Sequence, residues 1–357
     1  MLIAHVVGAR PNFMKAAPVI RALALRPSVR QILVHTGQHY DFNMSDVFFQ
    51  ELGMPAPDIN LQVGSGSHAQ QTAEIMRRFE DVVLQHKPDL VLVYGDVNST
   101  AAAALVCAKL ETRVGHVEAG LRSFDRSMPE EINRVITDQI ADLLFTPSAD
   151  GNENLKREGI LPERVFLVGN VMIDTLLRML PAAQSSNHNA VTGRYALVTL
   201  HRPANVDNRE WLSGLMAVLN DVQKDLTVIF PVHPRTRKQL ADSGLSVANH
   251  DRLRLLDPLP YLEFLALQSR ATLVITDSGG VQEETTYLGV PCFTMRKNTE
   301  RPITVDLGTN TLLGSDFEGL RLGIIKALSG AGKKGTIPPL WDGRAAERIA
   351  DIIAGHS

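Results

Sequence analysis

The chain has 357 residues, of which 44% are hydrophobic and 21% are charged, and its formal net charge is −3. This length exceeds what one hydrophobic core usually serves, so we expect a globular protein with two domains of ordinary size. The small net charge excludes an overall basic field for nucleic acid or an anionic membrane, so any phosphate site must be local.

The first half of the chain predicts a series of β–α units. Residues 2–7 form an apolar strand, residues 8–12 a turn, and residues 13–25 a helix with Lys15 in its first turn. Further strands are expected at 31–36, 90–94, 113–117, 143–146 and 165–168. Because continuous apolar strands alternate with amphipathic helices, we predict a parallel sheet covered on both faces.

The second half of the chain predicts a similar series. Its strands are expected at 195–200, 227–232, 253–255, 271–275 and 291–295, again with helices between them. The small, polar stretch 181–193 is the expected linker region. The sequence therefore predicts an α/β protein made of two doubly wound halves.

The cysteines and the apolar runs bear on the cellular compartment. Cys107 and Cys292 lie in apolar runs, which argues against a disulfide framework and against a cysteine metal site. The first eight residues carry no basic flank or cleavage site, and no apolar run approaches the ~20 residues of a membrane helix. We expect a cytoplasmic protein.

Residues 276–284, Thr-Asp-Ser-Gly-Gly-Val-Gln-Glu-Glu, connect an apolar strand to a helix. Two glycines at this turn remove Cβ bulk, so backbone amides at the helix start can approach a diphosphate, whose charge the helix dipole favours. The acidic residues one turn later suit ribose hydroxyls. A plain tight β–α connection explains the stretch equally well when it is taken alone.

Chemically active side chains follow the predicted strands, where ligands bind in open α/β sheets. The first half presents Arg10, Lys15, His35, Gln38, His39, Asp96, His116 and Glu118, and the second presents His201, Arg202, His233, Arg235, Arg296 and Arg301. The first half also carries Glu130 and Glu131 after a proline. This division suggests a nucleotide held by one domain and a sugar transformed by the other.

Structural roles compete with these interpretations. Asp96 could cap the helix that follows it, and acids are favoured at a helix start, which would account for Glu130 or Glu131. His116 and Glu118 could be partners in a buried hydrogen bond. No histidine pair has the one-turn helical spacing of a zinc site, so no metal is expected.

The sequence resembles the non-hydrolysing UDP-N-acetylglucosamine 2-epimerases over nearly its whole length. The motifs that carry the resemblance are 8–11 with Lys15, 36–39, Gly95-Asp96, 115–122, 129–134, His201-Arg202, 231–234, 276–284 and 299–302. The resemblance implies a GT-B fold, with two Rossmann-like domains and the active site in the cleft between them. It places the first domain at 1–169, completed by the C-terminal segment 344–357, and the second at 170–343.

Site residues follow from the matching motifs. The family's catalytic carboxylates fall on Asp96, Glu118 and Glu130, and its catalytic histidine falls on His201. Its contacts to the UDP-sugar fall on Arg10, Lys15, His233, Ser278, Gly279, Gly280, Glu284 and Arg301. The resemblance also implies a cytoplasmic homodimer of a polysaccharide-precursor pathway that needs no metal and no nicotinamide cofactor.

Two departures from the family pattern concern regulation and substrate. Family members activated by their own substrate carry a different segment after the Gln-His pair, whereas here residues 40–45 follow, and their allosteric arginine aligns near Glu74. We therefore expect no activation from a second substrate site. The Gln-His-Tyr-Asp version also resembles epimerases of a 2,3-diacetamido glucuronic acid, so a related UDP-sugar is an alternative substrate.

Inverting C2 of such a sugar requires help from C1, because C2 has no adjacent carbonyl and its proton is not acidic. As UDP departs, positive character at C1 makes the C2 proton removable by a carboxylate. Re-addition of UDP with protonation on the opposite face gives the other epimer. Three carboxylates favour this chemistry over a GT-B glycosyltransferase, which needs one base, or over a silent UDP-sugar-binding module.

Overall fold

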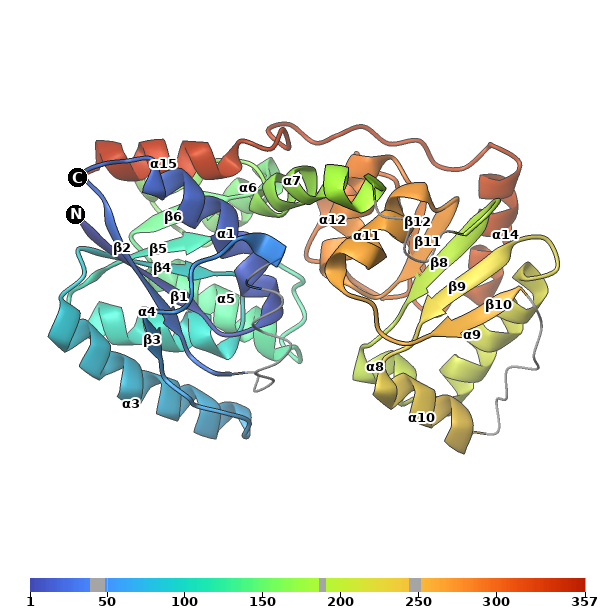
Figure 1. The fold of residues 1–357 in the computed structure, drawn as a ribbon, viewed down its shortest axis with the longest axis horizontal. Coiled ribbons are helices and arrows are strands. Elements are labelled where there is room, and N and C mark those ends of the chain that lie inside the picture. The colour runs from blue at the N-terminus through green and yellow to red at the C-terminus, as the bar shows by residue number, and fades with distance from the viewer. Residues whose placement is uncertain (39–48, 50, 186–190, 244–251, 357) are drawn as a thin grey trace. The chain divides into compact units, whose positions relative to one another are not determined.

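The computed structural model describes the chain except residues 39–48, 50, 186–190, 244–251 and 357. The chain forms two compact units, one comprising Met1–Thr175 with Pro339–Ser357 and the other Leu176–Pro338. The boundaries expected from the resemblance, 169/170 and 343/344, stay a prediction. Figure 1 traces each unit along the chain.

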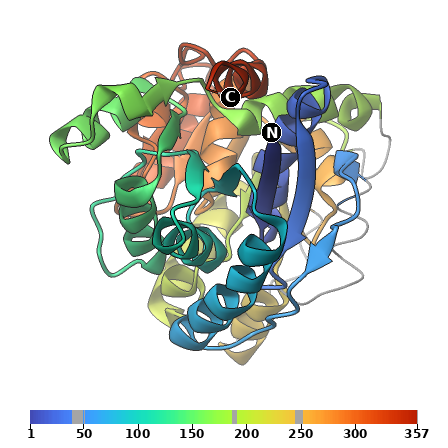
Figure 2. The same ribbon diagram turned by 90° about the vertical axis from the view of Figure 1, so that its left-hand side faces the viewer.

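Unit 1 contains a parallel sheet whose described residues form seven strands in the order β3-β2-β1-β4-β5-β6-β7. The strands are β1 (Leu2–Val7), β2 (Arg30–His35), β3 (Ile59–Asn60), β4 (Leu90–Tyr94), β5 (Arg113–Val117), β6 (Leu143–Thr146) and β7 (Val165–Leu167). The helices are α1 (Arg10–Ala24), α3 (His68–His86), α4 (Asn98–Lys109), α5 (Pro129–Ile140), α6 (Ala149–Arg157), α7 (Val171–Ser185), which continues into unit 2, and α15 (Ala345–Gly355). Figure 2 turns this unit toward the viewer.

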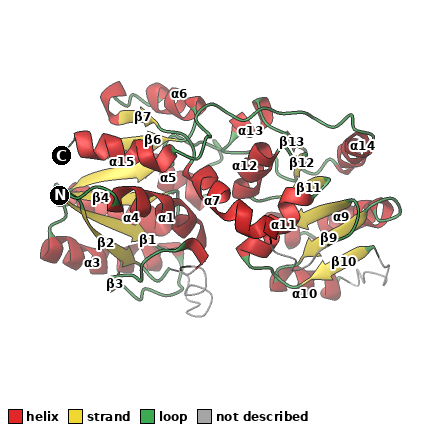
Figure 3. Cartoon of the chain, turned by 45° about the horizontal axis from the view of Figure 1, so that its top comes forward, coloured by secondary structure: helices red, strands yellow, loops and turns green. Residues whose placement is uncertain are grey.

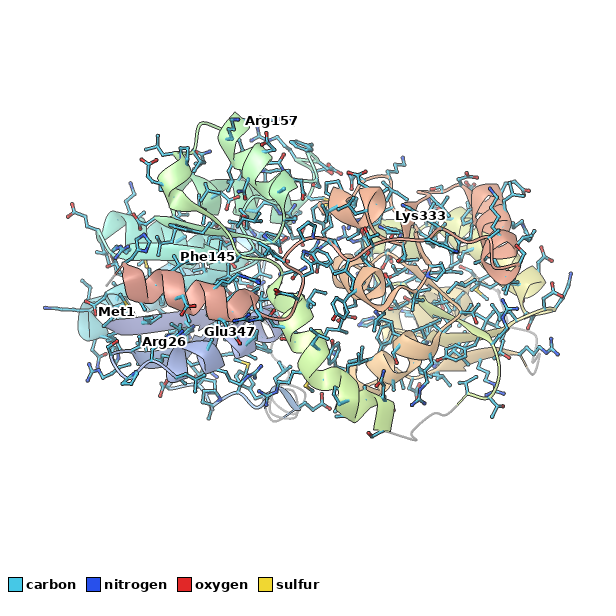
Figure 4. All side chains as sticks on the ribbon, turned by 90° about the horizontal axis from the view of Figure 1, so that it is seen from above. Met1, Arg26, Phe145, Arg157, Lys333 and Glu347 are labelled. Atoms are coloured by element: carbon cyan, nitrogen blue, oxygen red, sulfur yellow. The ribbon has the colours of Figure 1, made fainter. Side chains whose placement is uncertain are left out.

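The last helix completes unit 1 from the far end of the sequence. Helix α15 packs against α1, and both chain ends lie in this unit (Figures 1 and 2). Asp174 accepts hydrogen bonds from the amides of Ala345 and Ala346, at 3.2 and 2.7 Å, at the start of α15. Arg26, after α1, forms an ion pair with Asp351 of α15. Figure 4 labels Arg26 and also Glu347, which lies on α15.

Unit 2 contains a second parallel sheet whose described residues form six strands in the order β10-β9-β8-β11-β12-β13. The strands are β8 (Tyr195–Thr199), β9 (Thr227–Pro231), β10 (Leu253–Leu256), β11 (Leu273–Thr276), β12 (Cys292–Thr294) and β13 (Asn310–Leu312). The helices are α8 (Pro203–Val206), α9 (Arg209–Val222), α10 (Pro234–Asp242), α11 (Tyr261–Arg270), α12 (Gly279–Leu288), α13 (Pro302–Asp306) and α14 (Phe317–Leu328). Figure 3 shows the strands and helices by colour.

Both sheets have the strand order of a dinucleotide-binding fold, in which the first strand lies between the second and the fourth. Strands β1 and β4 are therefore the neighbours at which unit 1 changes winding direction, and β8 and β11 are those of unit 2. Ligands bind beyond the carboxyl ends of strands at such points. In the described part of the chain no helix is long and apolar enough to cross a membrane.

The predicted α/β class is confirmed, and the eleven predicted strands all form. The two short edge strands β3 and β13 were not predicted, because neither has a run of apolar residues long enough to be recognised. The expected turn at 8–12 is wrong in its second half. Helix α1 begins at Arg10, because Pro11 occupies the first turn, where a backbone N–H has no intrahelical acceptor.

The expected linker at 181–193 is also wrong in its first part. Pro181 lies inside α7, which continues to Ser185. The surrounding leucines and alanines carry the helix past the proline, and the Ser185 hydroxyl donates to the Pro181 carbonyl at 2.9 Å. Residues 186–190 of this stretch lie outside the described residues.

Candidate active site

Unit 1 brings Lys15 and Glu118 together beyond the ends of β1 and β5. Lys15, in the second turn of α1, is buried, and its ammonium group forms an ion pair with the Glu118 carboxylate. Gly95 lies beside the pair, since a Cβ there would be 2.6 Å from Lys15 Nζ and 3.2 Å from Glu118 Oε2. The sequence placed both residues at the strand ends without predicting this contact. Arg10, the first residue of α1, is exposed.

Glu118 has an unusual backbone conformation. Its φ is +77°, in the left-handed region that residues with a side chain rarely adopt. The amides of Glu118 and Ala119 both donate to the carbonyl of Phe145, at 3.1 and 3.0 Å, which holds the turn in place. Strain of this kind persists where the surroundings over-determine it, and functional sites are where it accumulates.

Asp96 follows β4 and is held by helix α5. Its carboxylate forms an ion pair with Arg134, and its carbonyl accepts from Asn133 Nδ2 at 2.9 Å. The Asp96 side chain remains 23% exposed. The sequence named Asn133 and Arg134 only as part of a motif. Their positions on the same helix as Glu130 were the available signal that they share the site.

The structure separates the two glutamates that follow Pro129. Glu131 is buried, accepts from the amide and hydroxyl of Ser123 at 2.9 Å and from the amide of Phe124 at 2.8 Å, and forms an ion pair with Arg134. Glu131 therefore anchors the loop between β5 and α5. Glu130 is half-buried and lines a cavity of about 310 Å³.

Polar side chains make up most of the lining of that cavity. Besides Glu130 it is lined by Asp96, Asn133, Gln38, His68, Gln71 and Asn98, together with Ser65, Gly66, Val97 and Pro129. The lining side chains are already organised by hydrogen bonds, among them Asn98 Nδ2 to Gln71 Oε1 at 2.8 Å. Such a surface suits a ligand rich in hydroxyl and amide groups. His39 and the segment 40–45 lie outside the described residues.

His116 does not pair with Glu118 as the sequence suggested. Its Nδ1 is 2.6 Å from Asp138 Oδ1, and its Nε2 donates to the carbonyl of Gly95 at 2.8 Å. In a strand, residues 116 and 118 would point to the same face of the sheet. The positive φ of Glu118 breaks this pattern and directs its side chain toward Lys15. Asp138, two turns into α5, was not recognised from the sequence.

In unit 2, Asp277 connects the carboxyl ends of the neighbouring strands β8 and β11. It follows β11, is fully buried, and accepts from the amides of His201 and Arg202 at 3.1 and 3.0 Å and from Asn205 Nδ2 at 3.1 Å. Burial alone would raise the pKa of Asp277, but these hydrogen bonds and its contact with His201 hold the pKa below its usual value. His201 Nδ1 lies 3.1 Å from the carboxylate, while its side chain is 53% exposed.

The predicted anion-binding turn forms the start of helix α12. Ser278 is the N-cap, and Gly279 and Gly280 are the first helical residues, whose amides have no intrahelical acceptor. A Cβ on Gly279 would lie 2.5 Å from Arg301 Nη1 and 2.8 Å from Glu300 Oε1. The glycine thus leaves room for the Arg301 guanidinium beside the helix start.

The remaining predicted contacts lie in the same unit. Arg301 is buried and forms ion pairs with Glu300 and, at 2.8 Å, with Glu283. Glu284 accepts from the Tyr261 hydroxyl at 2.9 Å. His233 is exposed at the N-cap of α10. Tyr261 lies in no recognised motif, so no local pattern pointed to it.

Comparisons with known proteins place these features in a family. The family model described as UDP-N-acetylglucosamine 2-epimerase matches residues 21–354. A UDP-N-acetylglucosamine 2-epimerase of Methanococcus maripaludis is 43% identical over 98% of each chain. A UDP-2,3-diacetamido-2,3-dideoxy-D-glucuronate 2-epimerase of Pseudomonas aeruginosa is 42% identical over 99% of each chain.

Solved structures agree with the sequence comparisons. The crystal structure of the Methanocaldococcus jannaschii UDP-GlcNAc 2-epimerase in complex with UDP-GlcNAc and UDP matches with a TM-score of 0.90 and 43% identity, covering 99% of this chain and 100% of that one. A glycotransferase of kitacinnamycin, 13% identical with a TM-score of 0.61, shares the fold alone. The GT-B fold predicted from the sequence is confirmed. The chain belongs to the UDP-N-acetylglucosamine 2-epimerase family, whose enzymes are isomerases.

Proposed function

We propose that this chain interconverts UDP-N-acetylglucosamine and UDP-N-acetylmannosamine by inverting C2 of the sugar. The observation that carries the proposal is the set of three carboxylates in unit 1, each in different surroundings. Glu118 is paired with Lys15 and Asp96 with Arg134, whereas Glu130 lines the cavity and forms no ion pair among the described residues. The names of the relatives support the choice of substrate.

The reaction needs groups that take a proton from C2 on one face and return one on the other. Departure of UDP from C1 makes the C2 proton removable, giving a 2-acetamidoglucal, and re-addition of UDP with protonation on the opposite face gives the epimer. Glu118, with a lysine as counter-ion, suits the group that accepts the proton. Glu130, which has no ion pair in the described part of the chain, suits the group that returns a proton to C2.

Unit 2 would hold the UDP moiety. The start of α12 at Ser278, Gly279 and Gly280 offers amides and a helix dipole to the diphosphate, and Arg301 lies beside it. Asp277 fixes one nitrogen of the exposed His201, which leaves the other for the departing phosphate. Glu284 would take the ribose hydroxyls, with Arg10 and His233 as further contacts. Lys15, expected at the diphosphate, would instead hold Glu118.

The direct test is incubation of the protein with UDP-N-acetylglucosamine and no acceptor, followed by proton NMR. We expect the manno epimer to appear and, in deuterated water, to carry deuterium at C2. An oxygen label between C1 and the β-phosphorus should scramble into the non-bridging positions. A transient oxidation at C3 or C4 would leave that oxygen in place, so retention of the label with no glucal detected would refute elimination.

The two roles of the carboxylates can be separated with UDP-N-acetylglucosamine as the starting substrate. Glu130→Gln should still form UDP and 2-acetamidoglucal, because the first proton transfer does not need it. Glu118→Gln should form neither. The reverse result would exchange the two assignments.

A related UDP-sugar is the second candidate substrate, because the 2,3-diacetamido glucuronate epimerase is nearly as similar to this chain as the N-acetylglucosamine epimerase. The ratio of kcat/KM for the two UDP-sugars decides between them. A preference for the glucuronate would change the substrate and leave the C2 chemistry unchanged.

We further propose a cytoplasmic homodimer that needs no metal or nicotinamide cofactor and shows hyperbolic kinetics. Light scattering of the purified protein tests the dimer. Activity should persist in chelator, and conversion of the manno epimer should not require a trace of the gluco epimer. Activity lost in chelator and restored by one divalent ion would refute the metal-free mechanism.

A further inference from the structure

Asp138 is a fully buried carboxylate on α5 that none of the proposed steps uses. Its Oδ1 faces His116 Nδ1 at 2.6 Å, and its Oδ2 accepts from the Gly120 amide at 3.0 Å and from Arg122 Nη1 at 2.7 Å. Burial by itself would raise the pKa of Asp138, but the charges and hydrogen bonds of His116 and Arg122 outweigh it and hold the pKa below its usual value. Asp138 is therefore ionised.

The hydrogen bonds of His116 define its protonation. A carbonyl oxygen can only accept, so Nε2 must carry the proton that it donates to the Gly95 carbonyl. Nδ1 lies 2.6 Å from Asp138 Oδ1, so a proton lies between these two atoms. The imidazole is fully buried between this carboxylate and the turn that precedes Asp96.

The same carboxylate holds a second turn. Its Oδ2 accepts from the amide of Gly120, which has φ +81° and lies two residues after the strained Glu118. A Cβ on Gly120 would be 2.5 Å from the Gly151 carbonyl oxygen, so this turn is also fixed from its other side. Through His116 and Gly120, Asp138 joins the turn that carries Asp96 to the turn that carries Glu118.

We propose that Asp138 is a positioning residue for the epimerisation, and that with His116 it sets the relative placement of Asp96 and Glu118. The inference rests on the proposed function. A buried ionic pair is a costly way to stabilise a core, since apolar residues of similar volume usually serve as well or better. Placement of reacting groups is a different matter, because a shift of about 1 Å can lower a rate about 10²-fold.

Four variants test this role. Asp138→Asn and His116→Gln each disrupt the contact between the two residues, and the double variant removes both partners. Glu158→Gln is the matched control, because Glu158 binds the other side of Arg122, at 2.6 Å, without touching His116 or Gly120. Each protein is compared by kcat, by KM, by UDP affinity in calorimetry and by thermal unfolding.

We expect Asp138→Asn to lower kcat about 10²-fold with UDP affinity unchanged. Because both residues act through one contact, the double variant should be no slower than the slower single variant. Glu158→Gln should retain the wild-type kcat. Additive losses, an equal loss in Glu158→Gln, or a folded Asp138→Asn protein with the wild-type kcat would each overturn the proposal.

A spectroscopic measurement makes the result independent of variant folding. In protein labelled with ¹⁵N-histidine, the His116 resonances, assigned by their absence in His116→Gln, should show Nε2 protonated at neutral pH. An unprotonated Nε2 would overturn the proposed link from Asp138 through His116 to Gly95. Wild-type protein without C2 epimerase activity would refute the proposed function together with this role, whereas active wild-type protein and equally active Asp138→Asn would refute the positioning role alone.

Discussion

In each unit an aspartate follows the fourth strand in chain order, β4 in unit 1 and β11 in unit 2, and the two aspartates have opposite roles. In unit 2, Asp277 directly follows β11, is fully buried, and ties that strand end to the amides of His201 and Arg202 after β8. In unit 1, Gly95 separates Asp96 from the end of β4, and the Asp96 side chain remains 23% exposed. In unit 1 the end of β4 is instead held by Asp138 of helix α5, which contacts His116, whose Nε2 donates to the Gly95 carbonyl.

This difference shows how one strand end can be structural and the other chemical. An aspartate that accepts several backbone amides is fully occupied and cannot also serve a substrate. Moving that structural task to Asp138 leaves the Asp96 carboxylate at the edge of the cavity, where its ion pair with Arg134 orients it. The inserted Gly95, with φ +62°, allows Asp138 rather than Asp96 to hold the strand end, because the Gly95 carbonyl accepts a hydrogen bond from His116.

The largest expected effect tests the chemical side of the comparison. Asp96→Asn and Glu118→Gln should each lower kcat about 10³-fold, because Glu118 is proposed to accept the C2 proton and Asp96 supplies a second carboxylate charge at the cavity. UDP affinity should be unchanged, because neither carboxylate is among the proposed contacts to UDP. NMR-detected epimerisation and calorimetry measure the two quantities. An Asp96→Asn protein with normal kcat and reduced stability would make Asp96 a structural residue like Asp277.

The next effect concerns nucleotide binding by unit 2. Gly279→Val should weaken UDP binding about 10²-fold, because its side chain would displace the Arg301 guanidinium and block the helix amides. Calorimetric titration with UDP measures the change, and circular dichroism checks the fold. Gly355→Val, in helix α15, where the backbone is helical and an added Cβ would meet no atom within 4 Å, is the control. Undiminished UDP affinity in folded Gly279→Val would move the diphosphate site elsewhere.

A smaller effect tests the structural side. Asp277→Ala should lower the free energy of unfolding by about 3 kcal/mol, because it leaves buried amides without their charged acceptor. The folded pKa of Asp277 lies below the ordinary 3.8, so its stabilisation is complete above that value and is lost as the pH falls below it. Urea unfolding of wild type and variant should therefore converge in acid. A constant difference at all pH values would contradict this account.

The smallest effect extends the comparison to Asp174, a carboxylate on which burial outweighs the favourable contacts. Burial raises the pKa of Asp174 to about 6, even though it accepts the amides at the start of α15. A raised pKa means that the folded state binds the proton more tightly, so this residue makes the protein more stable as the pH falls from about 6 toward 3.8. In Asp174→Asn this trend should disappear from urea unfolding curves. An unchanged trend would assign it to another group.

The sequence predicted the parts of this molecule that depend on local pattern. Strands such as β4 and β11 are continuous apolar runs because both faces of the sheet are covered, and such runs can be recognised without a structure. Fixed motifs likewise located Glu130, Ser278 and Gly279. The short strand β3 escaped because two residues carry no periodicity.

The partners of the site residues could not be predicted in the same way. Lys15 and Glu118 are 103 positions apart, and only the parallel order of β1, β4 and β5 brings them together. Asp96 and Asp277 both look like an aspartate after a strand, and their different roles depend on burial and on the contacts of Asp138. The choice between Glu130 and Glu131 depends on which side of α5 faces the loop at Ser123.

The return of the chain to unit 1 has a consequence for biosynthesis. Strand β1 and helix α1 leave the ribosome long before α15, which packs on α1 and is capped by Asp174. Unit 2 is continuous between these segments and can fold while unit 1 is still missing a helix. During translation, the apolar surface of α1 that α15 will cover therefore stays exposed until α15 has been made, and transiently exposed surface of this kind favours aggregation.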